Sequence, residues 1–195
     1  MTPIVTLLRL CDGEKPAMGK VYDRMFLLTQ KVQKCKASWA SKAATLVETR
    51  WEYLHSFMHG AGYAFDPEFI ENTSEWDAAV QNGAMEIVER LCLRDAMLEN
   101  IEGHEDPREA LTTESKVVVE KVAECEKQLA MYKKRENIFT KGSVLANAKT
   151  MPPADWWDMY GLHLPILSRV AKSVLEQVAI GSPLTGSSCP HATPT

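Results

Sequence analysis

The sequence predicts an all-α fold, an irregular bundle of six or seven helices. Apolar residues recur at steps of three and four in several segments, which is the spacing along one face of an α-helix. No stretch of alternating β-branched residues is long enough to build a sheet. The 195 residues are 45% hydrophobic and 25% charged, a composition typical of a globular domain.

The first third of the chain is predicted to form two helices and a loop. Residues 4–10 have a short amphipathic pattern that Asp12-Gly13 closes. A second helix starts near Pro16, because a proline in the first turn loses no hydrogen bond, and one apolar stripe continues over residues 21–46. Two glycines and an Asp-Pro pair within residues 60–67 predict a break in the helix and an irregular, packed loop.

The middle of the chain is predicted to contain two further helices. One covers residues 75–92 and continues more weakly to residue 101. The next begins at Asp106-Pro107, where the aspartate can cap the helix and the proline takes its first position. Its apolar residues again step by three and four, so we expect it to reach about Phe139 and to end at Gly142.

The last part of the chain is predicted to contain one more helix and a tail. A regular apolar stripe predicts the helix over residues 163–178, after the pair Trp156-Trp157. Residues 181–195 hold no charged side chain and are rich in Gly, Ser, Pro and Thr, which predicts disorder. We therefore expect one helical domain over residues 1–180.

Charge and cysteine content indicate which classes of protein the sequence fits. Lys and Arg total 22 and Asp and Glu total 26, a net charge of −4, whereas a freestanding nucleic-acid-binding domain usually carries a basic excess. The five cysteines contain no CxxC pair, which favours reduced thiols in the cytosol or nucleus. No signal peptide or membrane-spanning run is recognisable, so we expect a soluble intracellular protein.

No pattern of catalytic, cofactor-binding or metal-binding residues stands out. His55 and His59 lie one helical turn apart, but no glutamate follows the first, and the next histidine is His104. A buried or capping role for these histidines is therefore favoured over a metal site. Basic residues cluster over 31–42 and 133–141 and could contact phosphate, but the acidic total favours solvated helix faces.

The two adjacent tryptophans are the hardest feature to assign to a core. Neighbouring residues on a helix point about 100° apart, so Trp156 and Trp157 are not expected to face the same core. Tryptophan and tyrosine are enriched at interfaces. We therefore expect one indole to remain available to a partner.

The same block resembles the C-terminal block of hAT-family transposases. An upstream block resembles the one that opens the large helical insertion of plant-type members, and residues 3–23 resemble the stretch before it. The C-terminal resemblance is carried by Trp156-Trp157, Tyr160-Gly161, Pro165, Leu167, Ala171 and Val174-Leu175. The upstream resemblance is carried by Arg50-Trp51, Leu54-His55, Ala61-Gly62-Tyr63 and Phe65-Asp66-Pro67-Glu68-Phe69.

This resemblance implies part of a ribonuclease H-like transposase without its sheet. Residues 1–150 would correspond to the helical insertion, and residues 151–180 to the start of the dimerisation region. In the family, two aspartates and a late glutamate bind the metal ions that activate water for strand cleavage. The aspartates would precede Met1, and Pro190-His191 replaces the Glu-Arg pair expected after Cys189. Two-metal catalysis requires carboxylate ligands, so we expect no catalysis.

The resulting hypothesis is a truncated transposase-like protein with dimerisation activity and no cofactor. Its partner would be a second copy or an intact transposase-like protein, with weak or no DNA binding alone, no membrane contact, and a nuclear location, or a cytosolic one without an import partner. The alternative is a helical adaptor or scaffold that binds another protein through the Trp-bearing helix. The expected dimerisation residues are Trp156, Trp157, Tyr160, Gly161, Leu167, Val170, Ala171, Val174 and Leu175.

Overall fold

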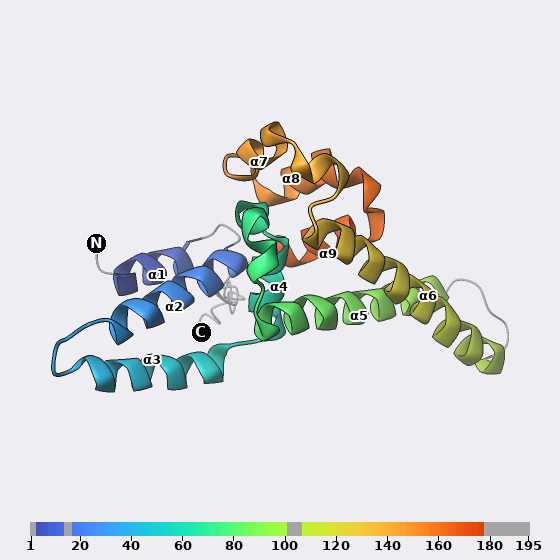
Figure 1. The fold of residues 1–195 in the computed structure, drawn as a ribbon. Helices are drawn as coiled ribbons and strands as arrows, with labels where there is room; N and C mark the ends of the chain where they lie inside the picture. The colour runs from blue at the N-terminus through green and yellow to red at the C-terminus, as the bar shows by residue number, and fades with distance from the viewer. Residues whose placement is uncertain (1–2, 14–16, 101–106, 178–195) are drawn as a thin grey trace, which may run out of the picture.

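The computed structural model describes residues 3–13, 17–100 and 107–177 of the chain. In these ranges it contains nine α-helices and three 3₁₀ helices and no strand, so the predicted all-α class is confirmed, with more helices than the six or seven expected. The helices form a branched bundle in which α4 stands between α1, α2 and α3 on one side and α5 and α6 on the other (Figure 1). The predicted tail over 181–195, Pro16 and Asp106 lie outside the described residues.

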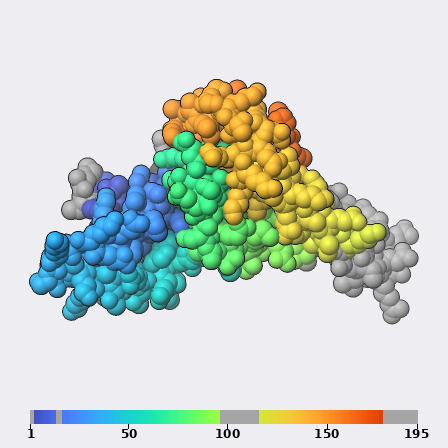
Figure 2. Space-filling model, viewed as in Figure 1, coloured from blue at the N-terminus to red at the C-terminus, as the bar shows by residue number. Residues whose placement is uncertain are grey.

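The N-terminal part of the chain forms an arm of three helices. These are α1 (Pro3–Cys11), α2 (Met18–Gln33) and α3 (Ala40–Leu54). The prediction of one long helix across residues 21–46 is wrong, because the chain turns back over residues 34–39. Folding back places α3 beside α2, but it leaves most of the α3 half of the stripe exposed: Ala40 is the only buried residue of α3. The arm projects from the rest of the molecule (Figure 2).

Helix α4 (Phe57–Phe65) replaces the irregular loop that the glycines predicted. A Cβ on Gly62 would lie 2.8 Å from the backbone N of Gly19 in α2, and one on Gly60 would lie 2.6 Å from the carbonyl O of Ala79 in α5. The glycines therefore allow α4 to contact its neighbours backbone to backbone. They are packing residues of a helix, and the break comes only at Asp66, before the 3₁₀ helix η1 (Pro67–Glu75).

Two long helices form the other arm of the fold. Helix α5 (Ala78–Asn100) confirms the prediction for residues 75–101, and α6 (Pro107–Lys133) begins at the predicted proline. It ends before the expected Phe139, because Arg135 adopts a positive φ of 53°. The Arg135 N–H then donates to the Tyr132 carbonyl at 2.9 Å and the Glu136 N–H to the Met131 carbonyl at 3.0 Å, the pattern of a Schellman cap.

The C-terminal helices close the core above α4. After η2 (Asn137–Thr140), Gly142 begins α7 (Gly142–Ala148) and does not end α6 as predicted. Helix α8 (Pro153–Tyr160), η3 (Gly161–His163) and α9 (Pro165–Leu175) follow, and α9 confirms the last predicted helix with shorter bounds.

The start of α9 is capped by a residue from another helix. Helix α9 has no side-chain cap of its own. The buried Gln128 of α6 supplies one, because its Oε1 accepts from the backbone N–H groups of Ile166 at 3.1 Å and Leu167 at 3.0 Å. This cap, in which one oxygen accepts two hydrogen bonds, fixes α9 against α6 and satisfies donors that the helix itself cannot pair.

Candidate protein-interaction surface

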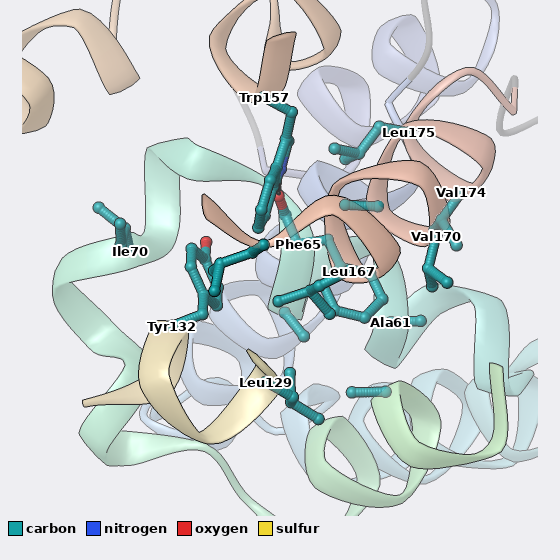
Figure 3. Close-up of a cluster of buried hydrophobic side chains, with 14 of the residues drawn as sticks. Ala61, Phe65, Ile70, Leu129, Tyr132, Trp157, Leu167, Val170, Val174 and Leu175 are labelled. Atoms are coloured by element: carbon teal, nitrogen blue, oxygen red, sulfur yellow. Dashed lines mark hydrogen bonds between the residues drawn. The ribbon is translucent and has the colours of Figure 1, made fainter. Parts of the chain in front are cut away.

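The nine residues expected to form a dimer surface lie in the interior of the molecule. Trp156 and Trp157 are both 0% exposed, and the side chains of α9 that follow them are buried as well. Figure 3 shows Trp157 beside Phe65 and Tyr132, with the apolar side chains of α9 next to them. The buried set comprises Trp156, Trp157, Tyr160, Gly161, Leu167, Val170, Ala171, Val174 and Leu175.

The expectation that one indole faces a partner is therefore wrong. The two indoles do diverge, with ring planes 82° apart. Each meets a different part of the same chain: Trp156 Nε1 donates to the Val144 carbonyl in α7 at 3.1 Å, and Trp157 Nε1 donates to the Phe65 carbonyl in α4 at 2.8 Å. Helices α7 and α4 lie on different sides of α8, so diverging side chains can both be core residues.

The apolar surface that remains exposed lies on the N-terminal arm. Eight of the thirteen large apolar side chains that are exposed in the described part of the chain belong to residues 4–54. Three of these eight border a groove of about 540 Å³ between α1, α2 and α3, which we call the arm groove. Leu46 of α3 is 59% exposed on this groove, and Leu8 and Leu54 line it from α1 and α3.

Helix α1 forms one wall of the arm groove without being buried there. It buries none of its residues. Its apolar residues Ile4, Leu7, Leu8 and Cys11 have the i, i+3, i+4, i+7 spacing that is typical of a helix that lies in an apolar groove. The arm therefore presents both an apolar groove and an amphipathic helix of the kind that such a groove binds.

The two basic clusters differ in how they are used. In the first, Lys31, Lys34, Lys36 and Lys42 are exposed around the α2–α3 turn, and none forms an ion pair within the described ranges. In the second, Lys133 Nζ donates to Gln81 at 2.7 Å and lies 5.2 Å from the centre of the Trp76 ring. Lys134 lies 3.9 Å from Glu136. The second cluster is therefore part of the fold's own surface contacts.

The two histidines at the start of α4 have structural roles. His59 Nδ1 accepts a hydrogen bond from the Ser56 backbone N–H at 3.2 Å, as part of a capping box. The His55 and His59 rings are stacked 5.9 Å apart, and burial lowers the pKa of each. The capping role favoured from the sequence is confirmed for His59, whereas His55 is the half-buried residue at the C-cap of α3. Among the described residues, no group of three potential ligands could hold a metal ion.

One buried carboxyl group lies at the junction of α4 and η1. Burial raises the pKa of Asp66 to about 6, although its Oδ1 accepts a hydrogen bond from the Glu68 backbone N–H at 3.0 Å. Lys20 of α2, which pairs with Glu68 at 2.7 Å, partly opposes this rise. The group caps η1 and has a structural role.

Comparison with known proteins gives no assignment: no family model, no curated protein and no solved structure matches the chain. In the described part of the chain, no helix is both long and apolar enough to cross a membrane.

Sequence reasoning missed the arm groove because it treated every helical stripe as buried. A signal for the groove was present in the short helix predicted over residues 4–10. Its apolar face is not matched by a neighbouring predicted helix of the same length that could cover it. Leu46 was placed on a core stripe that the turn at residues 34–39 interrupts. A stripe shows which residues share a helix face, and burial depends on what the rest of the fold supplies.

Proposed function

We propose that the chain is a protein-association module of the hAT transposase type that has no catalysis of its own. It acts by joining a second copy of itself or an intact transposase-like protein, in the nucleus, with weak or no DNA binding alone. The resemblance of several motifs, in the same order along the chain, supports the hAT family. The arm groove supports the association with another chain. The observation that carries the proposal is the exposed apolar groove beside an amphipathic helix that buries none of its residues.

A second copy is the occupant that fits the groove best. Each copy carries a groove and an apolar helix, so a two-fold dimer can place the exposed face of α1 from one copy against the groove of the other. Such an isologous contact occurs twice in the dimer, uses the exposed apolar faces of both copies, and needs no second kind of protein. The Trp-bearing block supports this arm by forming the core, and does not contact the partner.

An adaptor that binds a different protein through the arm groove is the second candidate function. The two indoles of the Trp-bearing helix cannot form its contact, because both are buried. The same groove would bind an amphipathic helix from another protein in the same way. Whether the chain associates with itself distinguishes the two candidates.

Sedimentation velocity at several protein concentrations tests the proposal. We expect a concentration-dependent dimer that Leu46→Asp weakens about tenfold or more, because the dimer would bury an unpaired charge. Leu162→Asp is the matched control, because Leu162 is 75% exposed on η3, outside the arm, and its dimer should equal the wild type.

Two outcomes would contradict the proposal. A monomer at every concentration would exclude self-association and leave the adaptor function. A dimer that is equally strong in the wild type and in Leu46→Asp would show that another surface forms the contact.

A further inference from the structure

A second cleft lies at the base of the arm and shares Met25 and Trp51 with the arm groove. It has a volume of about 270 Å³ and is walled by α2, the second half of α3, and Asp77 at the start of α5. A smaller hollow of about 100 Å³ adjoins it and shares Tyr22, Phe26 and Asp77 with it. We call the two together the aromatic-acidic cleft.

Aromatic rings form the walls of this cleft. The Tyr22 and Trp51 rings meet edge to face with centroids 5.9 Å apart, and Tyr63 lies 5.3 Å from Tyr22 in the smaller hollow. Phe26 lines both parts and is 54% exposed. The exposed Phe26 ring adds little to the core, so it offers an aromatic surface to whatever enters the cleft.

Every charged side chain in the lining is a carboxylate. Glu48, Glu52 and Asp77 line the main part, Asp23 and Glu75 line the smaller part, and no Lys, Arg or His lines either part. Asp23 pairs with Arg24 at 3.3 Å. The other four form no ion pair within the part of the chain that the structure describes.

Neutral donors hold two of these carboxylates in place. Asp77 accepts from the Tyr22 hydroxyl at 2.8 Å and from the Val80 backbone N–H at 2.9 Å. Glu48 accepts from Gln33 Nε2 at 2.9 Å. These hydrogen bonds fix the direction of the carboxylates but leave their negative charge without a cationic partner. The cleft therefore combines positioned negative charge with exposed aromatic faces.

We propose that the aromatic-acidic cleft binds an alkylammonium cation, either a small free amine or the side-chain end of a lysine or methylated lysine in a peptide. An ammonium group gains from the faces of aromatic rings and from nearby carboxylates together. A hard metal ion would gain only from the oxygens, and the rings would exclude part of its ligand shell. The proposal does not require the proposed association through the arm groove, although Met25 and Trp51 line both hollows.

Two-dimensional NMR of the full chain, titrated with tetramethylammonium chloride and separately with a short peptide carrying one trimethyllysine, tests the site. We expect saturable shifts in the residues of the cleft that sodium chloride at the same ionic strength does not produce. Phe26→Ala should weaken binding about 3- to 30-fold through loss of a cation–π contact, and Glu52→Gln should weaken it to a similar extent.

The controls are variants of the same chemistry outside the cleft. Leu162→Ala removes an exposed apolar side chain, Glu120→Gln removes an exposed carboxylate of α6, and neither should change the affinity. Equal affinity for the two probes assigns the site to a free amine, and a tighter peptide assigns it to a peptide side chain; both support the proposal. The proposal is overturned if neither probe gives saturable shifts, or if Phe26→Ala and Glu52→Gln bind as the wild type does.

Discussion

The Asp66 side chain caps the local backbone, but burying its charge lowers the stability of the whole fold. Its carboxylate caps η1 through the Glu68 N–H, and this position leaves it 3% exposed. Burial penalises the ionised form more than the hydrogen bond and Lys20 favour it, so the pKa rises from 3.8 to about 6. A raised carboxyl pKa contributes stability below pH 3.8 and loses that contribution as the pH rises through 6.

Asp66→Asn should therefore become more stable relative to the wild type as the pH rises from 4 to 7. The amide oxygen can still accept from Glu68, and no charge is buried. A rise of the pKa from 3.8 to about 6 corresponds to about 3 kcal/mol at most. Urea unfolding at the two pH values measures the change, with Asp12→Asn in the exposed α1–α2 connection as the control for losing one negative charge. An Asp66→Asn difference that is the same at both pH values would contradict the argument.

At the scale of elements, α4 shows how tertiary packing changes the effect of a glycine on a helix. In the sequence, Gly60 and Gly62 beside Asp66-Pro67 predict a break, because glycine weakens an isolated helix. In the fold, the same residues let three helix backbones meet. The local cost of about 1 kcal/mol for each glycine is offset by the burial that close contact allows.

Gly62→Ala should lower the free energy of unfolding by about 1–3 kcal/mol, since its Cβ would lie 2.8 Å from the Gly19 backbone N and one helix must move. Gly142→Ala is the matched control. A Cβ there meets nothing within 4 Å at the start of α7, so stability should stay unchanged or rise by up to about 1 kcal/mol. Denaturation followed by circular dichroism measures both. A Gly62→Ala protein as stable as Gly142→Ala would mean that α2 and α4 do not meet so closely.

Helix positions could be predicted from the sequence, and several helix ends could not. The stripes placed α1, α5 and α9 well because these helices have regular apolar spacing. The ends of α2 and α6 depend on tertiary contacts and on left-handed backbone at Arg135, a residue type that gives no signal for it. From the sequence, Gly142 is expected to end a helix. In the fold no neighbouring atom crowds this position, and the residue begins α7.

At the scale of the molecule, the core and the exposed apolar surface are in different places. The buried cluster is built from α4 to α9 with η1 and η2, and Tyr22 is its only member from the arm. Among the described residues, α1 buries none and α3 buries only Ala40. The arm is therefore held by fewer buried side chains than the rest, and elements of this kind open first.

Hydrogen–deuterium exchange should show this division. We expect the backbone amides of α1 and α3 to exchange about tenfold or more faster than those of α4 and α9, because local opening exposes them without disturbing the core. Association at the arm groove should slow exchange in the arm at high protein concentration and leave α9 unchanged. Equal protection in arm and core at low concentration would contradict the division.

The candidate surfaces could be predicted only in part. Sequence reasoning assigned one indole of the Trp-bearing block to a partner, but α7 and α4 of the same chain enclose Trp156 and Trp157. That enclosure depends on contacts such as the bond from Trp157 to Phe65, 92 residues away, which no local pattern shows. The aromatic-acidic cleft likewise joins Phe26, Glu52 and Asp77 from three segments.

The cap that Gln128 places on α9 bears on the order in which the helices can pack during synthesis on the ribosome. Helix α9 contacts α4, α5 and α6 and buries six residues among them, yet it follows all of them along the chain. Until α9 leaves the exit tunnel, the faces that it covers stay open to water. The nascent chain therefore passes through a stage with formed helices and an unclosed core, the kind of species that chaperones bind. Gln128 is by then already synthesised in α6, where it can receive the first N–H groups of α9.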